Sequence, residues 1–187
     1  MKKGTIILIA VIAVIAIIAF SCVETYNSLV EQREKVDTQY SAIETQLQRR
    51  IDLIPNIVNT VKGYAAHESE VFGAVSDARA RLAGASTKEE AAEADSELTS
   101  AVSRLLMIAE NYPDLKADTQ FTALTDELAG TENRIAVARK DYNDAAKTYN
   151  TQIKTFPKVI IANLFGFEKA EYFEAAEGAK SAPQVNF

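Results

Sequence analysis

The chain has 187 residues, a formal net charge of −6 at pH 7 and one cysteine, Cys22. Its acidic balance excludes the basic face that nucleic acids require, so no nucleic-acid partner is expected. It also disfavours broad electrostatic adhesion to anionic lipids. A single cysteine excludes an intramolecular disulfide and a thiolate metal site. The length suits one small domain with an accessory segment.

The accessory segment is Thr5–Val23 (TIILIAVIAVIAIIAFSCV), which has no charge and no proline. A helix of about 19 residues rises about 28 Å, close to the hydrocarbon thickness of a bilayer. We expect a transmembrane helix that contacts membrane lipid, after a short tail at residues 1–4. It should continue into a bundle domain at 24–166 and a C-terminal tail at 167–187. Nothing at residues 21–27 predicts a break in the helix.

Two alternatives for this segment remain open. Residues 19–22 (AFSC) loosely resemble a lipoprotein processing site, in which Cys22 would be lipidated, although Phe20 is unusual there. A cleaved signal peptide is the other alternative, but it has a shorter apolar core. Lys2 and Lys3 precede the span, so the positive-inside rule favours an extracytoplasmic bundle on a bacterial cytoplasmic (inner) membrane, with a single pass.

The rest of the chain reads as helix almost throughout. After residue 23, apolar residues repeat with a period of about 3.5, which is typical of coiled coils and helix bundles. The first helix should end at Lys62-Gly63 and contains Pro55, which we expect to kink it. The apolar positions are Tyr26, Leu29, Val36, Tyr40, Ile43, Leu47, Ile54, Ile57 and Val61.

Three further long helices are predicted. The second covers residues 66–83, and Thr87-Lys88-Glu89-Glu90 matches a capping box that opens the third. The third ends at Asn111-Tyr112-Pro113, because the residue before proline is disfavoured in a helix. Asp118 caps a fourth helix that runs to about residue 155. The chain is therefore predicted to be all-α, an up-and-down four-helix bundle that continues from the membrane helix.

The C-terminal part of the chain adds a short apolar helix. Residues 158–165 (KVIIANLF) follow Pro157 and precede Gly166, a candidate C-cap. We expect this segment to return to the membrane-near end and to pack near Tyr26 and Leu29 or contact lipid headgroups. Tyr142 and Tyr149, seven residues apart, are expected in the core, with hydroxyls that find partners near its edge.

A polar layer is predicted where Arg50 occupies an inward position of the first helix. An antiparallel fourth helix brings Gly130 and Glu132 to the same height, and Gly130 would leave room for the arginine head. We expect Arg50 to pair with Glu132, because a buried arginine needs a carboxylate. The set predicted as a structural polar layer or an interaction site is Arg49, Arg50, Asp52, Glu132, Asn133 and Arg134.

Several motifs resemble those of the LemA family of bacterial membrane proteins. They are YNSLVEQREKV (26–36), QRRIDLIPNIVNTVKGYAAHE (48–68), ENYPDLKA (110–117), FTALTDELAGTENRIAVARKDYNDAAKTYN (121–150), FPKVIIANLFGF (156–167) and YFEAAEGAKSAPQVNF (172–187). The resemblance covers nearly the whole chain. It implies an N-terminal membrane helix, an up-and-down helix bundle and no established enzymatic activity.

No catalytic constellation can be assembled from the residues. His67 is the only histidine, and HESEV at 67–71 lacks the second histidine of a zinc-protease helix. Acidic residues such as Glu89, Glu93 and Asp95 are expected on solvated helix faces. We expect no enzyme and no cofactor. The predicted function is a membrane-anchored scaffold or interaction protein that contacts its own copies or other membrane proteins; the alternative is a sensor or ligand-binding module built on Arg50 and Glu132.

Overall fold

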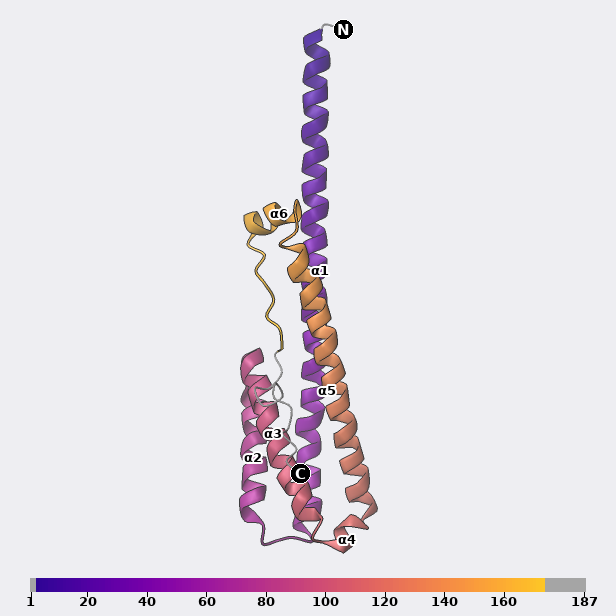
Figure 1. Cartoon of the computed structure of the whole chain (residues 1–187), viewed down its shortest axis with the longest axis vertical. Coiled ribbons are helices and arrows are strands. Elements are labelled where there is room, and N and C mark those ends of the chain that lie inside the picture. Colours follow the sequence, from indigo (N-terminus) through magenta and orange to yellow (C-terminus); the bar gives the residue numbers. More distant parts are fainter. Residues whose placement is uncertain (1–2, 174–187) are drawn as a thin grey trace, which may run out of the picture. The chain divides into compact units, whose positions relative to one another are not determined.

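The computed structural model describes residues 3–173, which form six helices and contain no strand (Figure 1). The predicted all-α class is confirmed. The helices are α1 (Lys3–Lys62), α2 (Ser69–Gly84), α3 (Lys88–Ala109), α4 (Pro113–Lys116), α5 (Thr119–Gln152) and α6 (Lys158–Phe165). Residues 1–2 of the predicted N-terminal tail and 174–187 of the predicted C-terminal tail lie outside the described residues.

Helix α1 is continuous from Lys3 to Lys62, so the predicted absence of a break at residues 21–27 is confirmed. Its N-terminal part is apolar and long enough to cross a membrane. The apolar side chains of that part are exposed, and none of the most apolar stretch is buried in the protein. Exposure of so much apolar surface to water is unfavourable, so this part of α1 needs an apolar environment.

The described residues divide into two compact units, and α1 and α5 contribute to both. Unit 1 comprises residues 3–40 and 140–172, and unit 2 comprises residues 41–139 and 173. In unit 1, the core lies where α1 and the second half of α5 face each other. Its fully buried side chains include Leu29, Val36, Tyr142 and Tyr149. The rings of Tyr40 and Tyr142 lie 6.1 Å apart, with an edge-to-face geometry that favours aromatic pairs.

Helix α6 belongs to unit 1 and has the predicted bounds. Gly166 ends it with a φ of 71°, a conformation that glycine adopts without strain. The Phe165 ring lies 4.9 Å from the Tyr26 ring, and Lys158 Nζ lies 3.5 Å from Ser28 Oγ. The predicted packing of this segment near Tyr26 is therefore confirmed.

Unit 2 contains residues 41–62 of α1, the helices α2, α3 and α4, and residues 119–139 of α5. Arg134 bonds Gln46 and Glu127 bonds Arg49, so α5 runs antiparallel to α1. Both predicted helix caps are present. Thr87 and Glu90 cap α3 reciprocally, and Asp118 Oδ1 accepts from Phe121 N at 2.9 Å.

Unit 2 differs from the sequence prediction in three respects. Helix α2 begins at Ser69 rather than at residue 66, α3 ends at Ala109 rather than at residues 111–113, and the sequence does not predict the short α4. Proline explains α4, because Pro113 occupies its first turn, where the missing N–H is not needed. Leu115 of α4 is fully buried, so this turn closes one end of the core of unit 2.

Candidate functional site

A charged layer lies inside unit 2, around Arg50 of α1. Arg50 Nη1 lies 2.6 Å from Asp95 Oδ1 and 2.7 Å from Glu132 Oε2, and Arg50 Nη2 donates to Thr99 Oγ1 at 3.0 Å. The side chains of Arg50 and Asp95 are only 3% and 2% exposed, whereas that of Glu132 is 46% exposed. One guanidinium therefore links α1 to α3 and α5.

Asp95 is the centre of this layer, because each of its oxygens contacts a different arginine. Oδ1 accepts from Arg50, and Oδ2 accepts from Arg139 Nη2 at 2.8 Å. The two arginines and the carboxylates of Asp95 and Glu132 carry opposite charges that cancel. Buried ions are tolerated only when their partners and hydrogen bonds replace water. We call these four residues the charged layer.

The charged layer retains two donors without a hydrogen-bond partner, the Nε atoms of Arg50 and Arg139. Arg139 is about one-third exposed, and its guanidinium lies 5.6 Å from the Phe173 ring centre. The contact between Glu132 Oε2 and Arg50 is an ion pair without hydrogen-bond alignment. The arrangement resembles a structural clamp more than an empty binding site, since no net charge is left for a ligand.

The other predicted site residues lie outside the charged layer. Arg49 and Arg134 both contact Glu127 Oε1, at 2.7 and 2.8 Å, in a largely exposed network. Asp52 accepts from Gln48 on the surface, and Asn133 is exposed. The structure thus brings Arg50 and Glu132 together and leaves Arg49, Asp52, Asn133 and Arg134 outside.

The space at Gly130 serves a different arginine from the one expected. The nearest atoms to a Cβ built at Gly130 belong to the guanidinium of Arg134, the closest at 3.4 Å, which is ordinary contact. Arg134 also donates to Thr131 Oγ1 at 3.1 Å. The space beside Gly130 is therefore occupied by the Arg134 side chain of the same helix and not by the guanidinium of Arg50.

Asp95 and Arg139 are absent from the predicted set, and the prediction that Asp95 lies on a solvated face is wrong. A signal for Asp95 exists in the sequence. Its position begins the three-four series 95, 98, 102, 105 and 109, and every member of that series is buried. Arg139 follows Glu132 by seven residues, which places both on one face of α5.

Pro55 leaves a carbonyl of α1 without its helical hydrogen bond, and the sequence does not reveal which group replaces that bond. Proline has no N–H, so the carbonyl of Ile51 loses its helical hydrogen bond. Arg79 of α2 replaces it, because its Nε donates to Ile51 O at 2.8 Å. Helix α1 continues past Pro55 to Lys62, and the carbonyl freed by the proline becomes a contact between α1 and α2.

A second polar site lies in unit 1, where α5 holds residues 168–171. Tyr149 and Tyr142 donate their hydroxyls to the carbonyls of Glu168 and Glu171, at 2.9 and 2.8 Å. The Asn150 side chain bonds both backbone groups of Ala170, donating to its O and accepting from its N at 2.8 Å each. We call these three side chains of α5 the clasp.

The clasp gives the core tyrosines their hydrogen-bond partners. Burial raises the pKa of Tyr149 above its ordinary value, and the nearby Arg33 guanidinium partly opposes that shift. Both tyrosine rings are fully buried, and a phenol in that position needs an acceptor for its O–H. Tyr142 and Tyr149 therefore hold the segment that follows α6 and also fill the core.

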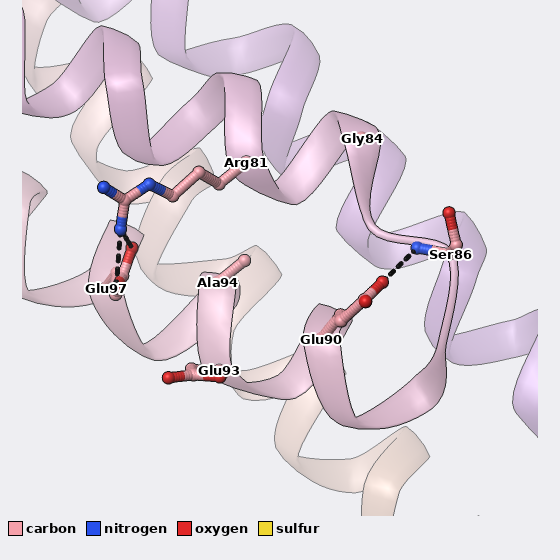
Figure 2. A pocket seen from close by; sticks show the side chains of 7 residues that line it. All are labelled: Arg81, Gly84, Ser86, Glu90, Glu93, Ala94 and Glu97. Atoms are coloured by element: carbon pink, nitrogen blue, oxygen red, sulfur yellow. Dashed lines mark hydrogen bonds and ion pairs between the residues drawn. The ribbon is translucent and has the colours of Figure 1, made fainter.

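A surface pocket lies at the turn between α2 and α3 (Figure 2). Arg81 Nη1 contacts both carboxylate oxygens of Glu97, at 2.9 and 2.7 Å. Glu90 accepts from the amides of Ser86 and Thr87, as a helix cap does. These polar groups are engaged with one another, so the pocket is explained by the turn and its cap.

His67 lies exposed in the connection between α1 and α2. Among residues 3–173, no three or more His, Cys, Asp and Glu side chains are grouped so that they could hold a metal ion. The continuous α1 and its exposed apolar end define a membrane-associated, all-α protein. Residues 39–187 match the LemA family, and the chain belongs to that family.

The chain is similar to proteins named as magnetosome proteins and to one named LemA. The magnetosome protein MamQ 2 of Paramagnetospirillum magneticum is 30% identical, with 93% of this chain and 74% of the relative covered. The magnetosome protein MamQ of Magnetospirillum gryphiswaldense is 27% identical, with 92% and 74% covered. The protein LemA of Metamycoplasma hominis is 25% identical, with 84% and 73% covered. None of these names indicates a catalytic activity.

Proposed function

We propose that this protein is a membrane-tethered helical scaffold that works by binding other proteins, further copies of itself among them. The observation that carries the proposal is α1, a single helix that has an exposed apolar segment in unit 1 and continues into unit 2. Any partner that binds the helical part is thereby recruited to a membrane. Two lysines before the span favour an extracytoplasmic helical part on a bacterial inner membrane.

The charged layer supports a structural role over a ligand-binding one. A sensor built on Arg50 and Glu132 would keep a charge in reserve for its ligand. Here Arg50 already contacts Asp95, Thr99 and Glu132. Two of the relatives are named as magnetosome proteins, and neither name indicates a ligand or a catalytic activity.

Photo-crosslinking in living cells tests the proposal. A photoreactive residue is placed at Val137 or at Met107, two exposed apolar positions on α5 and α3, and at Ala83, an exposed small residue on α2, as the matched control. A scaffold gives discrete protein adducts, identified by mass spectrometry, from Val137 or Met107 and fewer from Ala83. Recovery of monomer alone at all three positions contradicts the proposal.

A further inference from the structure

Helix α6 exposes an apolar face that the rest of unit 1 does not cover. Ile161 and Ala162 are buried against unit 1, whereas the Phe156 and Leu164 side chains are 77% and 72% exposed. Ile160 and Phe165 are also more than half exposed. Ile160 and Leu164 are four residues apart in α6 and therefore lie on one side of it, and Phe156 is exposed in the turn just before the helix. Contiguous exposed apolar surface of this kind marks an interaction site.

The position of α6 within unit 1 indicates what covers this face. Phe165 and Phe167 contact the Tyr26 ring at 4.9 and 5.6 Å. Tyr26 lies three residues after Val23, the end of the apolar segment, which is about 4.5 Å along a helix. Figure 1 shows α6 lying across the direction of α1 at this level. A span perpendicular to the membrane therefore places α6 along the membrane surface.

The polar groups around α6 agree with that orientation. Lys158 Nζ lies 2.7 Å from Gln152 Oε1 of α5 and 3.5 Å from Ser28 Oγ of α1, so its charge is directed toward these helices. Tyr26 joins Phe165 and Phe167 in an aromatic cluster, and aromatic rings are enriched at the level of lipid headgroups. Because α6 lies next to the end of the membrane span, lipid is the expected partner of its exposed apolar face.

We propose that α6 is a second membrane contact, an interfacial helix whose Ile160, Leu164 and Phe165 side chains, with Phe156 of the preceding turn, enter the boundary between headgroups and acyl chains. Helices of this type bury their apolar face in the interface plane. Eight residues would bind weakly alone, but α1 already holds α6 at the bilayer and raises its effective concentration there. The proposal rests on membrane insertion of α1.

Tryptophan fluorescence tests the proposal, because the chain contains no tryptophan. The full chain is reconstituted at high lipid excess in phosphatidylcholine vesicles brominated on the acyl chain, near the headgroup or near the bilayer centre. Leu164→Trp is the test variant, Met107→Trp the exposed control in unit 2, and Ile12→Trp the control for the span. All three positions are exposed in the protein, so a larger ring fits without disturbing the core.

We expect shallow bromines to quench Leu164→Trp several-fold more than Met107→Trp, and deep bromines to quench Ile12→Trp most. Equal quenching of Leu164→Trp and Met107→Trp overturns the proposal while leaving the anchor intact. A blue-shifted Leu164→Trp that bromines do not quench also overturns it, because a second copy of the chain then covers the face. Loss of quenching at Ile12→Trp refutes the anchor and the interfacial helix together.

Discussion

Helix α5 carries two polar sites of opposite chemistry, one in each unit. In unit 2 the charged layer joins Arg139 and Glu132 of α5 to buried ionic partners. In unit 1 the clasp uses neutral side chains, Tyr142, Tyr149 and Asn150, which bond backbone groups of residues 168–171. Both sites tie α5 to another segment of the chain.

The comparison shows how charge determines what a polar site can hold. A buried charge requires a counter-charge of suitable geometry, so the charged layer depends on four particular side chains. The clasp recognises carbonyls and one amide, which every residue except proline provides. The loss of one partner should therefore cost most in the charged layer, less in the clasp and least at exposed sites.

The largest effect is expected from Arg50→Met. It leaves Asp95, which is 2% exposed, without its nearest cation, and removing one partner of a buried pair costs about 3–5 kcal/mol. Denaturant unfolding of the full chain in detergent measures the loss. Arg49→Met is the matched control, because its pair with Glu127 is exposed and exposed pairs contribute under about 1 kcal/mol. Equal losses for the two variants would contradict the buried layer.

Double variants identify the principal partner of Arg50. Arg50→Met combined with Asp95→Asn should recover more stability than its combination with Glu132→Gln, because water can solvate the half-exposed Glu132 but not Asp95. Residues in one network are not additive, so the coupling is measurable. A larger recovery with Glu132→Gln would assign the central role to Glu132.

The clasp should respond with a smaller and more local loss. Asn150→Ala removes two hydrogen bonds and leaves the Ala170 amide and carbonyl unpaired, which costs about 1–3 kcal/mol. Hydrogen exchange should become faster at the Ala170 amide and remain unchanged in α3. Asn133→Ala, at an exposed position of the same helix, should change neither. Unchanged protection at Ala170 in Asn150→Ala would show that the clasp does not hold this segment.

The sequence predicts the helices well because their signals are local. The capping box at Thr87 and Glu90, the cap at Asp118 and the stop at Gly166 each act within a few residues, and all are present. The apolar seam fixes which face of each long helix is buried. The bounds of α6 follow from Pro157 and Gly166 for the same reason.

The partners of the polar residues are less predictable because they depend on tertiary contacts. The inward position of Arg50 follows from helical spacing, but two helices, α3 and α5, offer carboxylates to it. Asp95 is the one that the fold buries, and it is 45 residues away in the chain. Arg79 similarly meets the Ile51 carbonyl only because α2 packs beside α1. Helical spacing therefore predicts which face of a helix is buried, but it does not predict which residue of another helix that face contacts.

The contact at Pro55 should give an effect no larger than that of the clasp. Arg79→Met removes the guanidinium that donates to the Ile51 carbonyl, and such a hydrogen bond contributes about 1–3 kcal/mol. In a Pro55→Ala background the new backbone N–H can bond that carbonyl, so the same substitution should cost less. Unfolding of the four variants measures the coupling. An equal cost in both backgrounds would show that Arg79 does not compensate for the proline.

The smallest effect is expected at the exposed cap of α5, where charge matters without burial. Asp118 accepts hydrogen bonds from Phe121 N and from the Tyr64 hydroxyl, at 2.9 and 3.0 Å. These bonds lower the pKa of Asp118 below 3.8, and the backbone bond has the larger effect. A carboxyl with a lowered pKa stabilises the fold above its unfolded pKa, and this stabilisation is lost as pH falls through the folded value.

Unfolding measured from pH 7 to below pH 4 tests this cap. Stability should fall slightly at the acidic end in the wild type and less in Asp118→Asn, because asparagine still caps a helix but does not titrate. Tyr64→Phe removes one of the two bonds, so it should reduce the acidic loss only in part. Asp126→Asn, an exposed carboxylate of the same helix, is the control for net charge. If Asp126→Asn and Asp118→Asn change the acidic loss equally, general charge rather than the cap determines it, and the contrast between charged and neutral sites does not extend to the surface.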